Sequence, residues 1–125
     1  MRKPEDFTIL IVDDEERLRQ SLKKHFKLDN YNVLTAGGGY EALDIINEKK
    51  IDFVISDIRM PEGDGEMLLK KIRELNPKIP MIVMVTGFAE MSKEEAIKGG
   101  ALDLLAKPID IDLLEEYIAE QLNRQ

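Results

Sequence analysis

The sequence contains no cysteine and no tryptophan, and a single histidine stands among its 125 residues. Without cysteine, disulfide bonds, thiolate metal sites and catalytic thiols are excluded. A chain without disulfides suits a reducing compartment, so we expect a cytoplasmic location. The sequence also lacks any run of about 20 apolar residues, the length that a membrane-spanning helix needs. No apolar signal-peptide segment follows Met1.

Positive charge is scarce as well. The chain has 18 Lys and Arg residues against 25 Asp and Glu residues, which gives a formal net charge of -7. Nucleic-acid binding requires clustered positive charge, and no basic run here is long enough to supply it. Direct binding of nucleic acid by this chain is therefore not expected, and a role on DNA would need another domain. The lack of a long apolar run likewise gives no reason to expect a membrane partner.

Five apolar runs are present, and they predict strands at residues 7–12, 31–36, 52–56, 80–85 and 101–105. The first, third and fourth runs are apolar at nearly every position, which is typical of parallel strands buried on both faces. Apolar residues spaced three or four apart follow each run and predict helices. This alternation predicts a doubly wound α/β fold, in which helices cover both faces of a five-stranded parallel sheet.

Local signals place several helix ends. Ser92 with Glu95 predicts a capping box, and Gly99-Gly100 predicts a helix stop. Asn76-Pro77 predicts the end of the third helix. Asp64 is interpreted as a helix cap.

Polar residues stand at the carboxyl ends of four predicted strands: Asp13 and Asp14, Asp57, Thr86-Gly87, and Lys107-Pro108. Ligands of such sheets bind beyond these strand ends. Each feature alone is common loop material, and an Asp after the first strand could simply cap the first helix. Their joint placement on one edge of the sheet favours a functional site.

The acidic residues of this edge imply a cation. Asp13, Asp14 and Asp57 carry three negative charges, of which Lys107 balances one. A divalent ion would balance the other two, and oxygen ligands favour Mg²⁺, for which Mn²⁺ can substitute. Zinc is disfavoured here because the chain has no cysteine and His25 is its only histidine.

A carboxylate beside a metal ion and a lysine can accept a phosphoryl group. Carboxylates form covalent phosphoryl intermediates, and a metal ion and a lysine neutralise the phosphoryl oxygens during transfer. The chain has no Gly-x-x-x-x-Gly-Lys-Ser/Thr loop and no kinase signature. We therefore expect the phosphoryl donor to be an external molecule.

These residues resemble the motifs of response-regulator receiver domains of two-component systems. The similarity includes the Asp pair, the segment 57–65, Thr86-Gly87, Gly100-Ala101 and Lys107-Pro108. It covers about residues 7–122 of a single domain that spans 1–125. The resemblance, rather than the spacing of the residues, implies the flavodoxin-like strand order 2-1-3-4-5, which is known from a member of this superfamily.

The resemblance also implies a role for each acidic residue of the site. Asp57 would be the phosphoacceptor. Asp14, Asp57 and the backbone carbonyl of Arg59 would bind the Mg²⁺ ion directly, and Asp13 would orient it through water. The donor would be the phosphohistidine of a histidine kinase or of a histidine phosphotransfer protein, and the domain would not be a turnover enzyme.

Thr86 would donate a hydrogen bond to the phosphoryl group, and Lys107 would form an ion pair with it. Pro108 matches the family's cis-proline site, which directs the lysine inward. Phosphorylation would draw Thr86 inward and repack the face made by the fourth helix, the fifth strand and the fifth helix. That face would bind a downstream effector, and it could also support a dimer.

Two departures from the family pattern concern the switch and the phosphoryl lifetime. Leu104 stands where the family usually has an aromatic residue that swings as Thr86 moves, and Phe88 could replace it in part. Arg59 and Phe88 occupy positions that overlook the phosphoryl group. Because both are bulky, we expect them to slow hydrolysis by hindering water.

Two alternative functions fit these residues less well. A phosphatase of the haloacid-dehalogenase type needs a second Asp two residues after its nucleophile, where this chain has Arg59. A flavodoxin needs a Ser/Thr/Gly loop after the first strand, where this chain has four acids, 13–16.

His25 is interpreted as structural rather than as a phosphorelay histidine. A stand-alone receiver and a part of a longer regulator or hybrid kinase are both compatible with the sequence.

Overall fold

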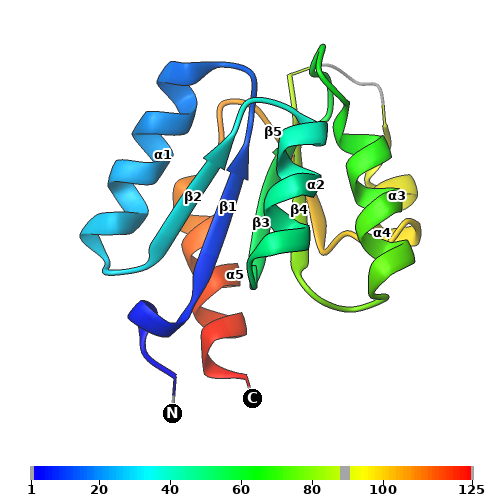
Figure 1. The fold of residues 1–125 in the computed structure, drawn as a ribbon. Helices are drawn as coiled ribbons and strands as arrows, with labels where there is room; N and C mark the ends of the chain where they lie inside the picture. Colours follow the sequence, from blue (N-terminus) through cyan, green and yellow to red (C-terminus); the bar gives the residue numbers. More distant parts are fainter. Residues whose placement is uncertain (1, 88–90, 125) are drawn as a thin grey trace.

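The computed structural model describes residues 2–87 and 91–124. After a short 3₁₀ helix, η1 (Pro4–Asp6), strands and helices alternate along the chain (Figure 1). The strands are β1 (Thr8–Val12), β2 (Asn32–Ala36), β3 (Phe53–Asp57), β4 (Met81–Thr86) and β5 (Asp103–Ala106). The helices are α1 (Glu16–Leu28), α2 (Gly39–Glu48), α3 (Gly65–Leu75), α4 (Lys93–Lys98) and α5 (Ile111–Asn123).

The strands form one parallel sheet in the order β2-β1-β3-β4-β5. This confirms the predicted fold class and strand order. The strand bounds differ from the predicted apolar runs by at most two residues, because pairing starts and stops with backbone geometry as well as with apolar character. Asp57 pairs with Val85 and is the last residue of β3, which confirms its expected place at the end of the third strand.

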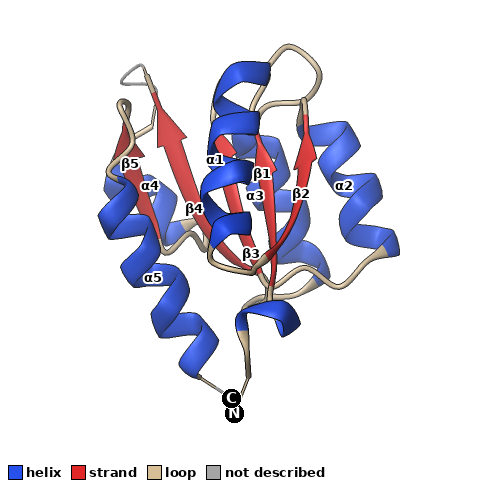
Figure 2. Cartoon of the chain, turned by 90° about the vertical axis from the view of Figure 1, so that its left-hand side faces the viewer, coloured by secondary structure: helices blue, strands red, loops and turns tan. Residues whose placement is uncertain are grey.

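Helices cover both faces of the sheet. Helices α1 and α5 lie on one face, which Figure 2 shows toward the viewer, and α2, α3 and α4 lie on the other. Successive strand residues serve opposite faces, as the pleat requires: Val83 and Val85 pack on the α1 and α5 side, whereas Ile82 and Met84 pack on the other. All five strands point toward one edge, where the loops that follow them gather.

The predicted helix ends agree with the structure at four places. Ser92 and Glu95 form the capping box of α4, and Asp64 caps α3 by accepting the Met67 N–H at 2.8 Å. Helix α3 ends before Asn76, and Gly100 ends the α4 turn with a φ of 108°. A side chain at such a positive φ is strained, so glycine suits this position.

The suggestion that Asp13 or Asp14 caps α1 is wrong. The N-cap is Glu15, which makes no side-chain cap hydrogen bond. The Asp13 carboxylate instead accepts the Glu15 N–H at 2.8 Å, so it orders the turn that precedes the helix. Among the described residues, no helix combines the length and the apolar character that crossing a membrane would require.

Candidate functional site

Asp57 lies at the carboxyl edge of the sheet, on the central strand β3. The residue is only 8% exposed. Its Oδ1 accepts a hydrogen bond from the Ile58 N–H at 2.8 Å, and its Oδ2 accepts one from Lys107 Nζ at 3.1 Å. The sheet thus presents a nearly buried carboxylate that has a donor at each oxygen.

Lys107 follows β5 and contacts two carboxylates at once. Its Nζ donates to Asp13 Oδ2 at 3.0 Å as well as to Asp57 Oδ2 at 3.1 Å. Asp13 follows β1 directly and is 3% exposed. One ammonium group therefore bridges acids that follow or end two different strands. Its positive charge reduces the repulsion between the two buried carboxylates, which would otherwise destabilise the fold.

The Asp57 carboxylate remains short of positive charge. Burial has the largest effect and raises the pKa of Asp57, and the negative charge of Asp13 raises it further. Hydrogen bonding and charge from Lys107 offset this only in part. For Lys107, burial lowers the pKa, but the hydrogen bonds to Asp13 and Asp57 outweigh burial and raise it. The lysine is firmly charged, whereas ionised Asp57 would be stabilised by a further cation.

Three carboxylates at this edge could ligate that cation. Asp13, Asp14 and Asp57 each offer an oxygen, and these atoms lie within 4.8 Å of one another. Asp14 is exposed, whereas the other two are buried. Because Lys107 balances one of the three charges, a divalent ion would balance the rest. The donor set consists of oxygen alone, which fits a hard cation such as Mg²⁺ or Ca²⁺.

An open cavity of about 720 Å³ gives access to this carboxylate group. It is lined by Asp14, Glu15, Asp57, Arg59, Met60, Pro61, Gly87 and Lys107. Sequence reasoning assigned no role in the site to Glu15, Met60 or Pro61, although all three lie within the quoted motifs. The cavity leaves room above Asp57 for a group larger than a metal ion.

Thr86 ends β4 beside the lysine. It stands opposite Ala106 in the register of β4 and β5, and its carbonyl accepts the Lys107 N–H at 2.9 Å. The backbone therefore fixes Thr86 and Lys107 relative to each other. The peptide bond between Lys107 and Pro108 is cis.

Gly65 allows α3 to begin directly against the end of β3. A Cβ atom at this position would stand 2.2 Å from the Asp57 carbonyl oxygen and 2.7 Å from Met84 Cε. The Gly65 N–H donates to the Ile58 carbonyl at 2.7 Å. This close approach fixes the loop after Asp57, and the sequence signal for it is the glycine directly after the Asp64 cap.

The residues expected to tune the switch are placed as follows. Leu104 stands opposite Met84 and packs, partly buried, against the apolar cluster beneath α2, α3 and α4. Arg59 is exposed and lines the cavity. Phe88 lies outside the described residues.

Sequence reasoning missed a buried carboxylate away from the carboxyl edge, Asp103, which is 6% exposed at the start of β5. Asp103 Oδ1 accepts the Leu104 N–H at 2.7 Å and pairs with Lys93 Nζ at 3.1 Å. Its Oδ2 accepts a hydrogen bond from the Tyr117 hydroxyl. Asp103 thus joins α4, β5 and α5. An acid within an apolar run needs buried partners, and that signal could have revealed it.

Comparison with known families decides the class of this site. The model of the response regulator receiver domain matches residues 9–119, which is most of the chain. The chain belongs to the response regulator receiver family. It is a receiver domain, and the interpretation as a haloacid-dehalogenase phosphatase has no support.

Curated relatives of this receiver domain are longer proteins. The transcriptional regulatory protein ZraR of Salmonella typhimurium is 41% identical over 114 residues, which are 91% of this chain and 26% of that protein. The regulatory protein AtoC of Escherichia coli K12 is 39% identical over 118 residues, which are 94% of this chain and 25% of that protein. The chain thus spans about a quarter of the length of these relatives.

Solved structures of receiver domains share the fold closely. The receiver domain of Francisella response regulator 1452 has a TM-score of 0.86 and 30% identity, over 94% of this chain and 97% of that one. TrrA of Thermotoga maritima, in complex with Mg²⁺ and BeF, has a TM-score of 0.81 and 29% identity, over 92% and 98%. A Burkholderia pseudomallei response regulator with a phosphorylated aspartic acid, calcium and citrate has a TM-score of 0.81 and 27% identity, over 90% and 66%.

Proposed function

We propose that Asp57 is the phosphoacceptor of this receiver domain and that residues 1–125 act as one signalling unit in the cytoplasm. The observation that carries the proposal is the contact of Lys107 Nζ with both Asp13 and Asp57 beside an open cavity. Such a lysine can exchange its contact with the Asp57 carboxylate for a contact with the negatively charged oxygens of an arriving phosphoryl group. The raised pKa of Asp57, which burial causes first, is consistent with a group that awaits further positive charge.

The transfer consists of one displacement. The Asp57 carboxylate oxygen attacks the phosphorus of a phosphohistidine on a histidine kinase or a histidine phosphotransfer protein. The new bond joins phosphorus to the Asp57 oxygen, and the phosphorus–nitrogen bond breaks. The donor imidazole keeps the electron pair of that bond and takes up a proton. Lys107 then pairs with a phosphoryl oxygen, and the Thr86 hydroxyl donates to another.

The acidic residues would hold a Mg²⁺ ion, for which Mn²⁺ can substitute. Asp14, Asp57 and the Arg59 backbone carbonyl would be its direct protein ligands, and Asp13 would bind through water. When bound, the ion supplies positive charge to the phosphoryl oxygens. The 4.8 Å limit on the separations among the three carboxylates supports this ligand set. The complex of the similar protein TrrA with Mg²⁺ and BeF gives further support.

The phosphorylated domain would act as a switch rather than as a turnover enzyme. No general acid/base follows Asp57 at the spacing that a phosphatase needs, since Arg59 stands there. Arg59 lines the cavity, so it would hinder the water that hydrolyses the phosphoryl group. Replacing Arg59 with Ala should therefore shorten the lifetime of the phosphorylated domain.

The output surface would be the face made by α4, β5 and α5. Its partner would be a downstream effector domain or protein, because the matched relatives are regulatory proteins about four times as long as their matched part. The same face could mediate dimers. With Leu104 in place of an aromatic residue, the switch would rely on movement of Thr86.

Phosphorylation with a small donor tests the acceptor. Phosphoramidate and Mg²⁺ should add one phosphoryl group to the protein, as seen by intact-protein mass spectrometry, and Asp57→Asn should abolish the addition. Asp64→Asn is the matched control, because Asp64 caps α3 and lies outside the carboxylate group. Addition that persists in Asp57→Asn, or repeated release of phosphate from a phosphate ester, would refute the proposal.

Binding of beryllofluoride tests the switch. With Mg²⁺, beryllofluoride should change the NMR chemical shifts of residues 91–106 as well as those of Thr86. Shifts confined to the cavity would mean that the signal does not reach the output surface. The same spectra of Asp57→Asn should show no change, which ties the effect to the proposed acceptor.

A further inference from the structure

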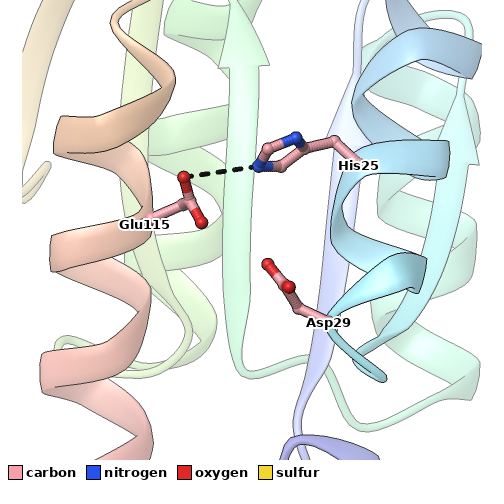
Figure 3. A group of neighbouring side chains, drawn as sticks. All are labelled: His25, Asp29 and Glu115. Atoms are coloured by element: carbon pink, nitrogen blue, oxygen red, sulfur yellow. Dashed lines mark ion pairs between the residues drawn. The ribbon is translucent and has the colours of Figure 1, made fainter.

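A second group of potential metal ligands lies far from the carboxyl edge, between α1 and α5. Figure 3 shows His25 and Asp29 at the end of α1 and Glu115 on α5, with the three side chains facing a common space. Each offers one ligand atom, and these atoms lie within 4.8 Å of one another. None of the three belongs to the site described above, and the sequence alone favoured a structural role for His25.

The separation between His25 and Glu115 suits a tetrahedral ion. His25 Nε2 lies 3.4 Å from Glu115 Oε1. Two ligand atoms at a metal–ligand distance of about 2.05 Å in a tetrahedral zinc site are about 3.3 Å apart. This pair therefore already has the required spacing. Asp29 is exposed, so its side chain can rotate to bring its oxygen to the same spacing.

The histidine nitrogen that faces this space lacks a hydrogen bond. His25 Nε2 is shielded from solvent and has no hydrogen-bond partner among residues 2–87 and 91–124, although the side chain as a whole is 40% exposed. The contact with Glu115 is close enough for an ion pair but does not have the geometry of a hydrogen bond. A nitrogen that is hidden from water without a partner gains from a ligand, and a metal ion would supply one.

The backbones that carry these ligands are held in place by the core. Phe26, next to His25, is fully buried, and its ring meets the imidazole edge-on at 5.2 Å between centroids. Leu114, next to Glu115, is also fully buried. Asp29 is the C-cap residue that directly follows α1, four residues beyond His25. Two of the three ligands, His25 and Glu115, thus lie on helices that the core anchors.

The chemistry of the donor set distinguishes this group from the carboxyl edge. An imidazole nitrogen with two carboxylates favours Zn²⁺ and similar transition-metal ions, whereas oxygen alone favours Mg²⁺. The two carboxylates would balance a divalent charge with His25 neutral. Exposure of Asp29 leaves a path for the ion to enter and a position for water.

We propose that His25, Asp29 and Glu115 bind one divalent transition-metal ion of the zinc class, with water as the fourth ligand, and so fasten α1 to α5. Since α5 belongs to the face assigned to output, the ion would tie that face to the rest of the domain. This inference does not depend on phosphorylation of Asp57.

Zinc titration of the whole chain in saturating Mg²⁺ tests the site. Calorimetry should show one bound Zn²⁺, and the nitrogen shift of Nε2 should change in NMR spectra. The assignment is direct because the chain has one histidine. His25→Gln and Glu115→Gln should each weaken binding at least about tenfold, since each removes one of three protein ligands. Glu116→Gln, the same change at the exposed neighbour on α5, should leave binding unchanged.

Two results would overturn the proposal. One is an Nε2 signal that does not respond to millimolar Zn²⁺. The other is zinc binding that His25→Gln leaves intact but Asp14→Asn removes, which would place the ion at the carboxyl edge. Circular dichroism of each variant establishes that it is folded. Because the Asp57→Asn variant should bind Zn²⁺ normally, failure here and failure of the phosphoacceptor proposal are distinguishable.

Discussion

Asp57 and Asp103 are both nearly buried acids paired with a lysine, yet their ionisation differs in direction. Asp57 is 8% exposed and Asp103 is 6% exposed. Each lies 3.1 Å from a lysine Nζ, of Lys107 and Lys93 respectively. The pKa of Asp57 is raised, however, whereas the pKa of Asp103 is lowered. Burial and a nearby lysine are therefore not enough to determine how a carboxylate behaves.

The difference comes from the other neighbours. Burial is the largest effect for both carboxylates and raises both pKa values. At Asp103, hydrogen bonds from the Tyr117 hydroxyl, the Leu104 N–H and Lys93 together outweigh burial. Asp57 shares Lys107 with Asp13, whose charge opposes its ionisation. Groups within the fold thus stabilise the ionised form of Asp103, whereas the ionised form of Asp57 needs ligands to stabilise it.

The comparison separates a structural acid from a functional one on physical grounds. The bonds of Asp103 join α4, β5 and α5. Asp57 faces a cavity and two further acids. A functional site can keep a carboxylate in an unfavourable environment because bound ligands stabilise its charge. Perturbing the two lysines and the two acids in parallel should therefore give different outcomes.

The largest expected difference is between the two lysines. Lys107→Ala should slow phosphorylation by phosphoramidate on the order of 100-fold, because it removes a charged donor from the transferring group. Lys93→Ala should leave the rate within about twofold, since Lys93 is 61% exposed on its side chain and forms its ion pair with the structural acid. The rates are measured by mass spectrometry of the intact protein.

Equal phosphorylation rates in the two lysine variants would contradict the distinction between a functional Asp57 and a structural Asp103. A folded Lys107→Ala variant that phosphorylates at the normal rate would show that the bridge between Asp13 and Asp57 is structural as well. Beryllofluoride binding in Lys93→Ala serves as the control that the output face still receives the signal.

The next largest effect concerns stability. Asp103→Asn should lower the free energy of unfolding by about 1–3 kcal/mol, because it weakens a buried charged acceptor that several donors share. Asp57→Asn should not lower it, since the change removes like-charge repulsion with Asp13 and keeps an acceptor for the Ile58 N–H. Urea unfolding at neutral pH without divalent ions measures both values. A loss in Asp57→Asn as large as that in Asp103→Asn would contradict the comparison.

The sequence was sufficient for the fold because each signal was local and repeated. Continuous apolar runs marked the buried strands, and the cap residues Ser92, Asp64 and Gly100 marked helix ends that the structure confirms. The starts of strands were less accurate. The fifth apolar run begins at residue 101, for example, but β5 begins only at Asp103, which pairs with Val83, and a neighbour that is distant in sequence determines that pairing.

The site could be predicted only in part for a related reason. Parallel strands bring their carboxyl ends to one edge, so the sequence predicted which acids gather there. It could not predict that Lys107 would bridge Asp13 and Asp57, since those distances depend on how the side chains pack. Asp103 was missed because its partners Lys93 and Tyr117 lie on other elements.

A smaller effect is expected on the pKa of Tyr117, which reports on the structural acid Asp103 alone. The hydrogen bond to Asp103 is the largest cause that raises the pKa of Tyr117 to about 12. Asp103→Asn should bring this pKa down toward its ordinary value of about 10. Alkaline titration of the phenolate absorbance, with Tyr117→Phe to assign the signal, measures the change. A Tyr117 that titrates alike in both proteins would show that the bond to Asp103 is weak in solution.

The smallest expected effect is a pair of opposite pH dependences in the protein without divalent ions. Asp103 has a lowered pKa in the folded state, so its stabilisation is present above the unfolded value of about 4 and is lost as the pH falls toward the folded pKa. Asp57 has a raised pKa when folded, so its contribution declines as the pH rises from about 4 through that folded pKa. Relative to the parent chain, Asp103→Asn should therefore lose least stability in acid, whereas Asp57→Asn should gain most above the folded pKa of Asp57. Thermal unfolding between about pH 3 and pH 7 measures both differences, and two differences of the same sign would mean that Asp57 and Asp103 are equivalent carboxylates.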